Sequence, residues 1–287
     1  MGRRPDRQPA DPALTASTVQ RWRLDAEAPA DGALERVIHT RPGQEWAPHW
    51  HEEWSVGAIV SGSCRFILSG REVEGVAGDV LAMAPRAVHT CTLGRESAHG
   101  AHVVMAYVPS DWLERHGIAV PAGSALVHSA AVARAAPGID GIPAARFWLE
   151  RALGALRDPA AALPTPPAPD SESARRVLRA LQDAAASDDP PSAEELARAC
   201  GMSREHFQRV GSRWLGMSPA AWLRTMRMTR ARKQLLAGGS IIQAAMACGF
   251  ADQAHFTRWF RRSFGYTPGA LVDARSHASA HPVRART

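Results

Sequence analysis

The chain has little cysteine, almost no lysine and no long apolar run. Its 4 cysteines are scattered along 287 residues, too few and too far apart for a disulfide scaffold or a Cys-x-x-Cys metal site. No apolar stretch approaches the roughly 18 residues that a membrane helix needs. The N-terminus, MGRRPDRQPADPA, is polar and lacks the apolar core of a secretory signal. We therefore expect a cytoplasmic, reduced protein without a membrane span.

Lysine is nearly absent, because Lys233 is the single lysine among 34 cationic residues. Arginine predominance suits bidentate contacts with phosphate and guanine, and it fits a bias of the source genome equally well. Residues 1–200 carry a net charge of −5 and residues 201–287 a net charge of +11. Such a basic C-terminal part is typical of a nucleic-acid-binding module. An anionic membrane surface is the alternative partner.

Hydrophobic residues make up 45% of the chain and charged residues 22%, which is ordinary for a globular protein. Its length suggests about two domains of roughly 150 residues. Short apolar runs with glycine-rich turns, and a Ser69-Gly70 hairpin signal, indicate a β-sandwich or barrel. We predict strands at 54–60, 64–68, 79–83, 88–93 and 102–108.

Helical spacing replaces the strand pattern after Asp111, notably at Phe147, Leu149, Leu153 and Leu156. A proline-rich stretch then indicates a semi-rigid linker. We predict a disordered tail over 1–20, a barrel domain over 21–157, a linker over 158–172, a helical domain over 173–274 and a frayed tail over 275–287.

The helical region contains an internal duplication. Residues 192–203 align with residues 240–251 at an offset of 48, and the match continues after one insertion from Phe207 and Phe256 onward. Each copy begins with a serine that can cap a short helix. Each first helix ends at a Cys-Gly pair, where glycine accepts the left-handed conformation. The two copies therefore predict helix-turn-helix units over 192–215 and 240–264.

The second helix of each unit has an apolar inner face and a polar, cationic outer face. Side chains of this kind in the early turns suit base edges in the major groove. A bundle with a solvated face is the alternative, whereas the apolar faces are too small to favour membrane binding. The candidate DNA-contacting residues are Arg204, Glu205, Gln208, Arg209, Gln253, Thr257, Arg258, Arg261 and Arg262.

A long helix is predicted between the two units. Ser218-Pro219 favours its start, since proline near the first helical position loses nothing, and Gly238-Gly239 ends it. About 20 residues at ~1.5 Å each give about 30 Å, close to the ~34 Å of one DNA turn. This connector could place two recognition helices in successive major grooves. Its cations, from Arg224 to Lys233, are candidates for phosphate contacts.

Residues 173–274 resemble the AraC/XylS family of bacterial transcription regulators. The motifs are Ala197–Ser203, Gly216–Pro219, Ala247–Phe250 and Phe264–Pro268. The resemblance implies a seven-helix domain that reads two nearby sites on double-stranded promoter DNA and acts on RNA polymerase, as an activator or a repressor. By motif position, the implied base readers are Glu205, Gln208, Arg209, Gln253, Thr257 and Arg258.

Two adjacent positions, Val210 and Gly211, depart from the family pattern. Gly211 stands in the first recognition helix, where glycine costs about 1 kcal/mol relative to alanine. We therefore expect the first recognition helix to be less rigid than the second.

The segment 43–53, with Gly78-Asp79 and His89, resembles a cupin over roughly residues 34–109, the sensory domain of one AraC branch. His49, His51 and His89 match metal-ligand positions of cupins, but the carboxylate expected near Ser55 or Val56 is absent. We expect no cofactor and a small-molecule pocket. The alternatives are a Zn²⁺ or Fe²⁺ site on these three histidines, or purely structural histidines. The candidate effector-binding residues are Trp46, His49, His51, Trp54 and His89.

Tryptophans near the cupin motif, including Trp50, could line a ligand pocket or pack in the core. Cys64 and Cys91 are expected to be buried apolar residues, with a thiol sensor as the alternative. The predicted fold class is two-domain α+β, with an N-terminal cupin-like double-stranded β-helix barrel and accessory helices. The C-terminal domain is predicted to be all-α, with two helix-turn-helix units joined by a long helix.

Two functions remain open. The favoured one is a one-component regulator, in which an effector in the barrel shifts the population of DNA-competent molecules. Helices within 111–157 would form a homodimer surface. The alternative is a metal-dependent cupin enzyme, a dioxygenase or isomerase, fused to a DNA-binding domain. The missing carboxylate counts against it, because oxygen activation prefers two histidines and one carboxylate.

Overall fold

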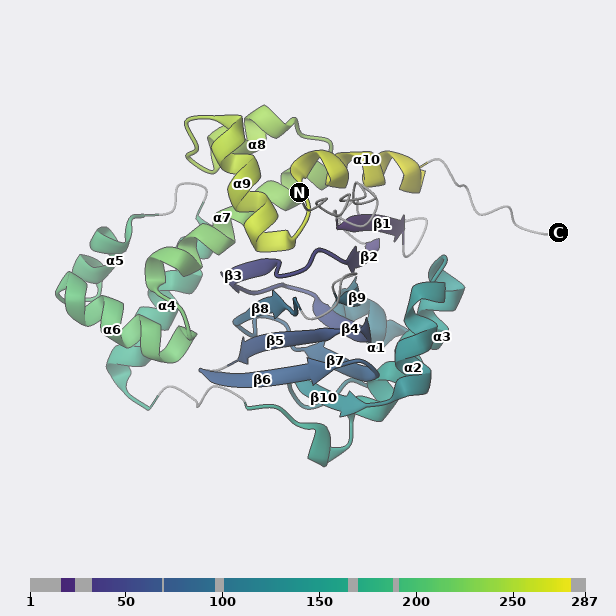
Figure 1. Cartoon of the computed structure of the whole chain (residues 1–287). Coiled ribbons are helices and arrows are strands. Elements are labelled where there is room, and N and C mark those ends of the chain that lie inside the picture. Colours follow the sequence, from purple (N-terminus) through teal and green to yellow (C-terminus); the bar gives the residue numbers. More distant parts are fainter. Residues whose placement is uncertain are drawn as a thin grey trace, which may run out of the picture.

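The computed structural model describes residues 17–23, 33–68, 70–95, 101–164, 170–187 and 191–279. Two antiparallel sheets face each other in the N-terminal part, and helices make up the C-terminal part (Figure 1). Helices α8, α9 and α10 lie over one end of the sheets, and α4, α5 and α6 lie to their side. Among the described helices, none is long and apolar enough to cross a membrane.

The larger sheet has the strand order β1-β2-β9-β4-β7-β10 and the smaller sheet the order β3-β8-β5-β6. All neighbouring strands are antiparallel, as the predicted barrel requires. The strand bounds are β1 (Thr18–Arg23), β2 (Ala33–His39), β3 (Glu45–His49), β4 (Trp54–Ser61), β5 (Ser63–Leu68), β6 (Arg71–Val76), β7 (Asp79–Met83), β8 (His89–Leu93), β9 (His102–Val108) and β10 (Ala125–His128).

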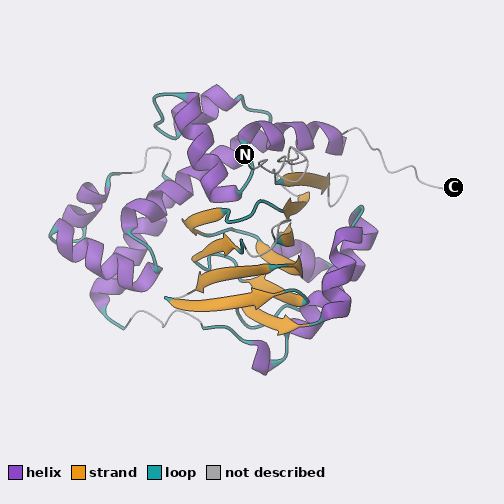
Figure 2. Cartoon of the chain, in the orientation of Figure 1, coloured by secondary structure: helices purple, strands orange, loops and turns teal. Residues whose placement is uncertain are grey.

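Alternation along the strands divides the barrel into two cores. On β7, Val80 and Ala82 pack with α1 (Ser110–Arg115), α2 (Ala130–Ala135) and α3 (Ile142–Leu156). Leu81 and Met83 point the opposite way, into the space between the sheets, since successive side chains of a strand face opposite sides. Figure 2 shows the accessory helices on the outer side of the strands.

The C-terminal part contains both predicted helix-turn-helix units. Ser192 and Ser240 each form a capping box with the third helical residue of α5 and α8. Gly201 and Gly249 end these helices with φ of 65° and 75°, values that glycine tolerates best. The helices are α4 (Glu172–Ala186), α5 (Ala193–Ala199), α6 (Arg204–Leu215), α7 (Pro219–Leu236), α8 (Ile241–Ala247), α9 (Gln253–Phe264) and α10 (Pro268–Ser279).

The predicted strands over 54–108 are present, and Leu68 pairs with Arg71 in the hairpin predicted there. Ser69 lies outside the described residues. The helix predicted from helical spacing is α3, where Phe147 is 62% exposed while the three leucines are buried. β1, β2, β3, β6 and β10 were not predicted. Polar residues interrupt the apolar pattern of β3 and β6, and β10 has only 4 residues.

Three predicted boundaries are corrected. The tail predicted over 1–20 includes the start of β1, which is held by pairing with β2 from Thr18 onward. The predicted linker begins as a short helix at Pro159–Ala161, and Ala162 bridges Ala125 of β10. The helix α10 packs on β1 and continues to Ser279, beyond the predicted end at 274. Residues 1–16, 165–169 and 280–287 lie outside the described residues.

Candidate nucleic-acid interface and effector pocket

The first recognition helix, α6, presents the polar face that the sequence predicts. The Ser203 hydroxyl accepts a hydrogen bond from the backbone N–H of His206, which fixes the helix start. Phe207 and Trp214 bury the opposite face. The predicted contact residues are all exposed, and they are Arg204, Glu205, Gln208 and Arg209.

The second recognition helix, α9, repeats this design with a more aromatic core. Asp252 accepts a hydrogen bond from the backbone N–H of His255 at 2.6 Å. Phe256, Phe260 and Phe264 are buried beneath the helix. Of the predicted contact residues, Thr257 is half-buried, and the exposed ones are Gln253, Arg258, Arg261 and Arg262.

Gly211 is a packing residue, which gives this glycine a structural role, and the expectation of a less rigid α6 stays a prediction. Its backbone is buried where α6 meets the start of α7. A Cβ atom added at Gly211 would lie 2.4 Å from Cγ of Pro219. Because protein interiors are close-packed, any side chain here would push the two helices apart. The glycine therefore allows a tight joint between α6 and α7.

The cations of α7 do not all face solvent, which only the structure could show. Arg232 is 6% exposed and points into the barrel domain. Its Nη2 lies 2.8 Å from Oε2 of Glu35, and its Nη1 donates to Oε1 of Glu53 at 2.8 Å. Its Nε donates to the hydroxyl of Tyr266, which donates in turn to Glu35. Arg232 is therefore an interdomain anchor, and it drops out of the cations of α7 that are candidates for phosphate contacts.

Arg232 and Glu53 stabilise each other's charged form inside this cluster. Burial alone would lower the pKa of Arg232, but Glu35 and Glu53 raise it well above its usual value. Burial alone would raise the pKa of Glu53, but Arg232 lowers it. Arg21 Nε also lies 2.7 Å from Glu35 Oε1, without the alignment of a hydrogen bond. Lys233 and Glu52 form a more exposed pair nearby, at 2.6 Å.

Apolar contacts join the domains on either side of the cluster. A Cβ at Gly265, directly after α9, would lie 2.7 Å from both His39 Cε1 and Trp46 Nε1. Trp50 packs on Trp222 of α7, with ring centroids 5.9 Å apart. Trp50 therefore forms part of the domain interface and does not line the cavity.

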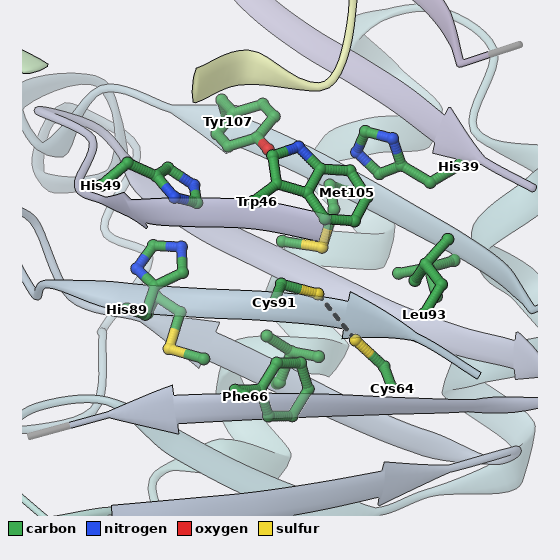
Figure 3. Close-up of a pocket in the computed structure, with 13 residues that line it drawn as sticks. His39, Trp46, His49, Cys64, Phe66, His89, Cys91, Leu93, Met105 and Tyr107 are labelled. Atoms are coloured by element: carbon green, nitrogen blue, oxygen red, sulfur yellow. Dashed lines mark hydrogen bonds between the residues drawn. The ribbon is translucent and has the colours of Figure 1, made fainter. Parts of the chain in front are cut away.

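A cavity lies between the two sheets (Figure 3). Its volume is about 40 Å³, which is room for roughly three water molecules. Trp46, His49 and His89 line it, as predicted. The residues that sequence reasoning missed come from strands on both sheets, and they are His39, Cys64, Phe66, Leu81, Met83, Cys91, Leu93, Val103, Met105 and Tyr107.

Trp54 does not belong to this cavity, so its prediction is corrected. It packs with Trp112 and Trp148 in the core under the accessory helices. Alternation on β4 places it, with Val56, on the outer face of the larger sheet. His51 is absent from the cavity lining but contacts its histidines, and its ring centroid lies 4.6 Å from that of Tyr107.

The three cupin-motif histidines form one buried cluster. Candidate ligand atoms of His49, His51 and His89 all lie within 4.8 Å of one another. Nδ1 of His49 bonds to the carbonyl of Ala47, and Nδ1 of His89 bonds to that of Ala87, both at 2.8 Å. Burial lowers the pKa of all three rings, which keeps them neutral.

No carboxylate of the described residues joins this cluster. Ser55 and Val56 occupy the positions where one was expected, and both are buried. Glu52 and Glu53 are close in sequence, but they pair with Lys233 and Arg232 instead.

Two thiols face each other in the cavity. Sγ of Cys64 lies 2.8 Å from Sγ of Cys91, and both cysteines are free (Figure 3). The contact with Cys64, together with burial, raises the pKa of Cys91 well above its usual value. Cys64 is buried in the apolar core between the sheets, as predicted, and Cys91 packs against that core while only partly buried.

Two family matches cover the two domains. Residues 31–138 match the AraC-like ligand binding domain, and residues 196–274 match a helix-turn-helix domain. The HTH-type transcriptional regulator ArgR of Pseudomonas aeruginosa is 33% identical over 94 residues, which are 32% of this chain and 29% of that protein. The virulence regulon transcriptional activator VirF of Yersinia enterocolitica is 40% identical over 75 residues, 26% of this chain and 28% of that protein.

The chain thus spans less than a third of the length of these curated relatives. The crystal structure of ToxT from Vibrio cholerae O395 covers more of the molecule. It aligns with 91% of this chain and 97% of its own, with a TM-score of 0.50 and 10% identity, so it shares the fold. With a ligand-binding domain of the AraC-like type before a helix-turn-helix domain, the chain belongs to the AraC family of transcription regulators.

Proposed function

We propose that this protein binds promoter DNA and regulates transcription in response to a small molecule held in its barrel. The observation that carries the proposal is the pair of recognition helices, which expose arginine and glutamine from equivalent early turns. The connector α7 has 18 residues, about 27 Å at ~1.5 Å per residue. That length favours recognition helices in successive major grooves, which are about 34 Å apart.

Base reading and phosphate binding would be divided between different side chains. Gln208 and Arg209 on α6, with Gln253 and Arg258 on α9, stand where base edges would be reached. Phosphate contacts fix the register but carry no sequence information. The names of the relatives as transcriptional regulators and activators support action at promoters, and contact with RNA polymerase is part of this proposal.

The test is selection of a preferred duplex from a random library, followed by titration of Arg258→Gln. We expect the variant to lose about 1–3 kcal/mol of discrimination at one base pair. Arg134→Gln, an exposed change on α2, is the control and should bind like the wild type. An equal loss on selected and unrelated duplexes would show that Arg258 does not read a base.

The effector would act through the contacts at the end of α9. His39 and Trp46 line the cavity and also pack against Gly265. Because the cavity holds only about 40 Å³, an effector must displace side chains in order to enter. Displacing these rings would change how α9 packs on the barrel, and this would change the population of DNA-competent molecules.

The three-histidine cluster fits a divalent metal such as Zn²⁺. Its rings are neutral, and the carbonyl contacts of two of them leave Nε2 free to coordinate, as in many histidine metal sites. A bound ion would supply a Lewis-acidic anchor for one donor atom of an effector. The absence of a carboxylate from the cluster favours sensing over dioxygenase or isomerase chemistry.

Dialysis of tag-free protein against Zn²⁺, with elemental analysis, tests this site. One ion per chain is expected, and His89→Gln should weaken binding by more than about 100-fold, since loss of even an outer-shell partner costs 10–100-fold. His39→Gln is the matched control, because His39 lines the same cavity outside the cluster. Equal loss in both variants, or no binding by the wild type, would exclude a metal role.

A homodimer is the proposed assembly. Phe147 on α3 is 62% exposed and lines a hollow together with residues of α2. A contiguous apolar surface of this kind is a candidate partner surface. Sedimentation equilibrium of the wild type and Phe147→Glu tests it. A dimer that becomes a monomer supports this surface, and a dimer that survives the substitution excludes it.

A further inference from the structure

The barrel rim and the second recognition helix together form a groove lined by arginines, called here the rim groove. Its barrel wall holds Arg41 and Arg95, and its α9 wall holds Arg258, Arg261 and Arg262. Glu45 is the only acidic residue among those that line it. The groove thus carries a strong positive charge beside the surface proposed to read bases.

The rim is held in place by glycine packing and hydrogen bonds. Gly43 has φ of 63° in the turn between β2 and β3, a conformation that favours glycine. A Cβ there would lie 2.4 Å from Nε of Arg95, so the Arg95 side chain rests directly on the turn. The Gln44 amide donates to the carbonyl of Gly265 at 3.3 Å. This bond ties the turn to the end of α9.

The charges of the groove are not balanced by the protein. All five arginines are exposed, and within the described ranges none of them lies in an ion pair. Arg232 shows the contrast, because it is buried with two carboxylates. Bringing like charges together raises the free energy of the docked domains, and a bound polyanion would relieve that repulsion.

We propose that the rim groove binds phosphates of the DNA backbone beside the bases faced by α9. The sensor barrel then contributes Arg41 and Arg95 directly to DNA binding, an inference that rests on the proposed function. A duplex carries one negative charge per about 1.7 Å of its axis, so a groove of several arginines can meet successive phosphates. These contacts orient the protein without selecting sequence.

The experiment compares the wild type with the Arg41→Gln/Arg95→Gln double variant on the selected duplex and on an unrelated duplex. The observed binding constant is measured over a series of salt concentrations. Two lost phosphate contacts should make the slope of log K against log salt shallower by about 1.8, at ~0.9 per contact. Affinity should fall by the same factor on both duplexes.

Two further variants sharpen the test. Arg71→Gln changes an exposed arginine on β6 outside the groove, and it should leave the slope unchanged. Glu45→Gln removes the acidic residue of the groove and should tighten binding on both duplexes. If each variant unfolds at the same midpoint temperature as the wild type, the exposed substitutions preserve the fold.

Two results would overturn the inference. An unchanged slope in the double variant means that the rim does not touch phosphate. Tighter binding by the double variant means that the rim obstructs α9. If the wild type selects no duplex at all, the proposed function fails instead, so the two failures are distinguishable.

Discussion

The two helix-turn-helix units have the same local design but different surroundings. α6 is closed against its own domain, since Gly211 lets it approach Pro219. α9 packs on β3 of the barrel, and the glycine that follows it touches two residues of the effector cavity. A duplicated sequence has therefore produced two units with different contacts to the barrel, and the second unit is the one that lies against residues of the cavity.

The cores beneath the units show the same difference. The first unit shares its core with Trp50 of the barrel, an apolar contact. The core of the second unit includes Val37 and Tyr107 of the barrel, and the buried charges of Arg232, Glu35 and Glu53 lie beside it. Charge pairs need a defined geometry to offset their desolvation, so the second unit is held in one orientation.

The largest expected effect comes from Arg232→Met. Removal of the cation leaves the partly buried Glu53 without its ion-pair partner and leaves the buried Glu35 with Arg21 as its remaining cation. This loss should cost about 3–5 kcal/mol of unfolding free energy. Lys233 is the next residue in the sequence, and its ion pair with Glu52 is partly exposed. Lys233→Met should therefore cost less than about 1 kcal/mol of unfolding free energy. Urea unfolding of both variants measures the difference, and equal losses would contradict a special role for the buried cluster.

The next effect separates the two units directly. Gly216 and Gly265 cap α6 and α9 in the left-handed conformation, where alanine costs about 1–2 kcal/mol. Gly265→Ala should cost a further ~1–3 kcal/mol, because its Cβ meets His39 and Trp46. A Cβ atom at Gly216 would have no contact shorter than 3.7 Å, so Gly216→Ala should not carry this further cost. Equal losses of unfolding free energy in the two variants would mean that α9 is not closely docked.

A pH effect tests the sensor side of that contact. Burial lowers the pKa of His39 to about 3, well below the unfolded value of about 6.5. The unfolded chain therefore binds a proton that the folded chain does not, and stability falls as the pH drops below about 6.5.

Between pH 7 and pH 5, His39 alone should account for about 2 kcal/mol of lost unfolding free energy. In His39→Gln the decrease should be smaller by that amount, measured by urea unfolding at both pH values. An unaltered pH dependence would mean that His39 is protonated in the folded protein.

The smallest effect probes the joint in the first unit. Gly211→Ala gains about 1 kcal/mol of helix propensity but meets Pro219, an overlap that costs about 1–3 kcal/mol. The difference is a net loss of up to about 2 kcal/mol. Gly154→Ala in α3 has no atom within 4 Å of its Cβ and should stabilise by up to about 1 kcal/mol. If both substitutions stabilised the protein, Gly211 would be only a weak helix former.

Local signals were enough to predict much of the fold. Caps and glycines within a few residues of each other defined both helix-turn-helix units, since those interactions act over one turn. Apolar runs predicted β4, β5, β7, β8 and β9. The exposed faces of α6 and α9 followed from helical periodicity.

The candidate sites were predicted less completely. The cupin motif brought out Trp46, His49 and His89, but alternation alone could not tell which face of the larger sheet receives Trp54. Met105 and Tyr107 carry no local signal for a cavity. Their position depends on how β9 pairs with β2 and β4, a long-range choice.

The amino-acid sequence by itself determined the two duplicated readers, their polar faces and the histidines of the barrel, because helix caps and side-chain periodicity are short-range effects. The tertiary structure alone decided that Arg232 would anchor the domains while Arg258 and Arg41 face one groove. Those assignments required residues about 200 positions apart or more to meet, and the free energy that selects such contacts comes from burial over the whole interface.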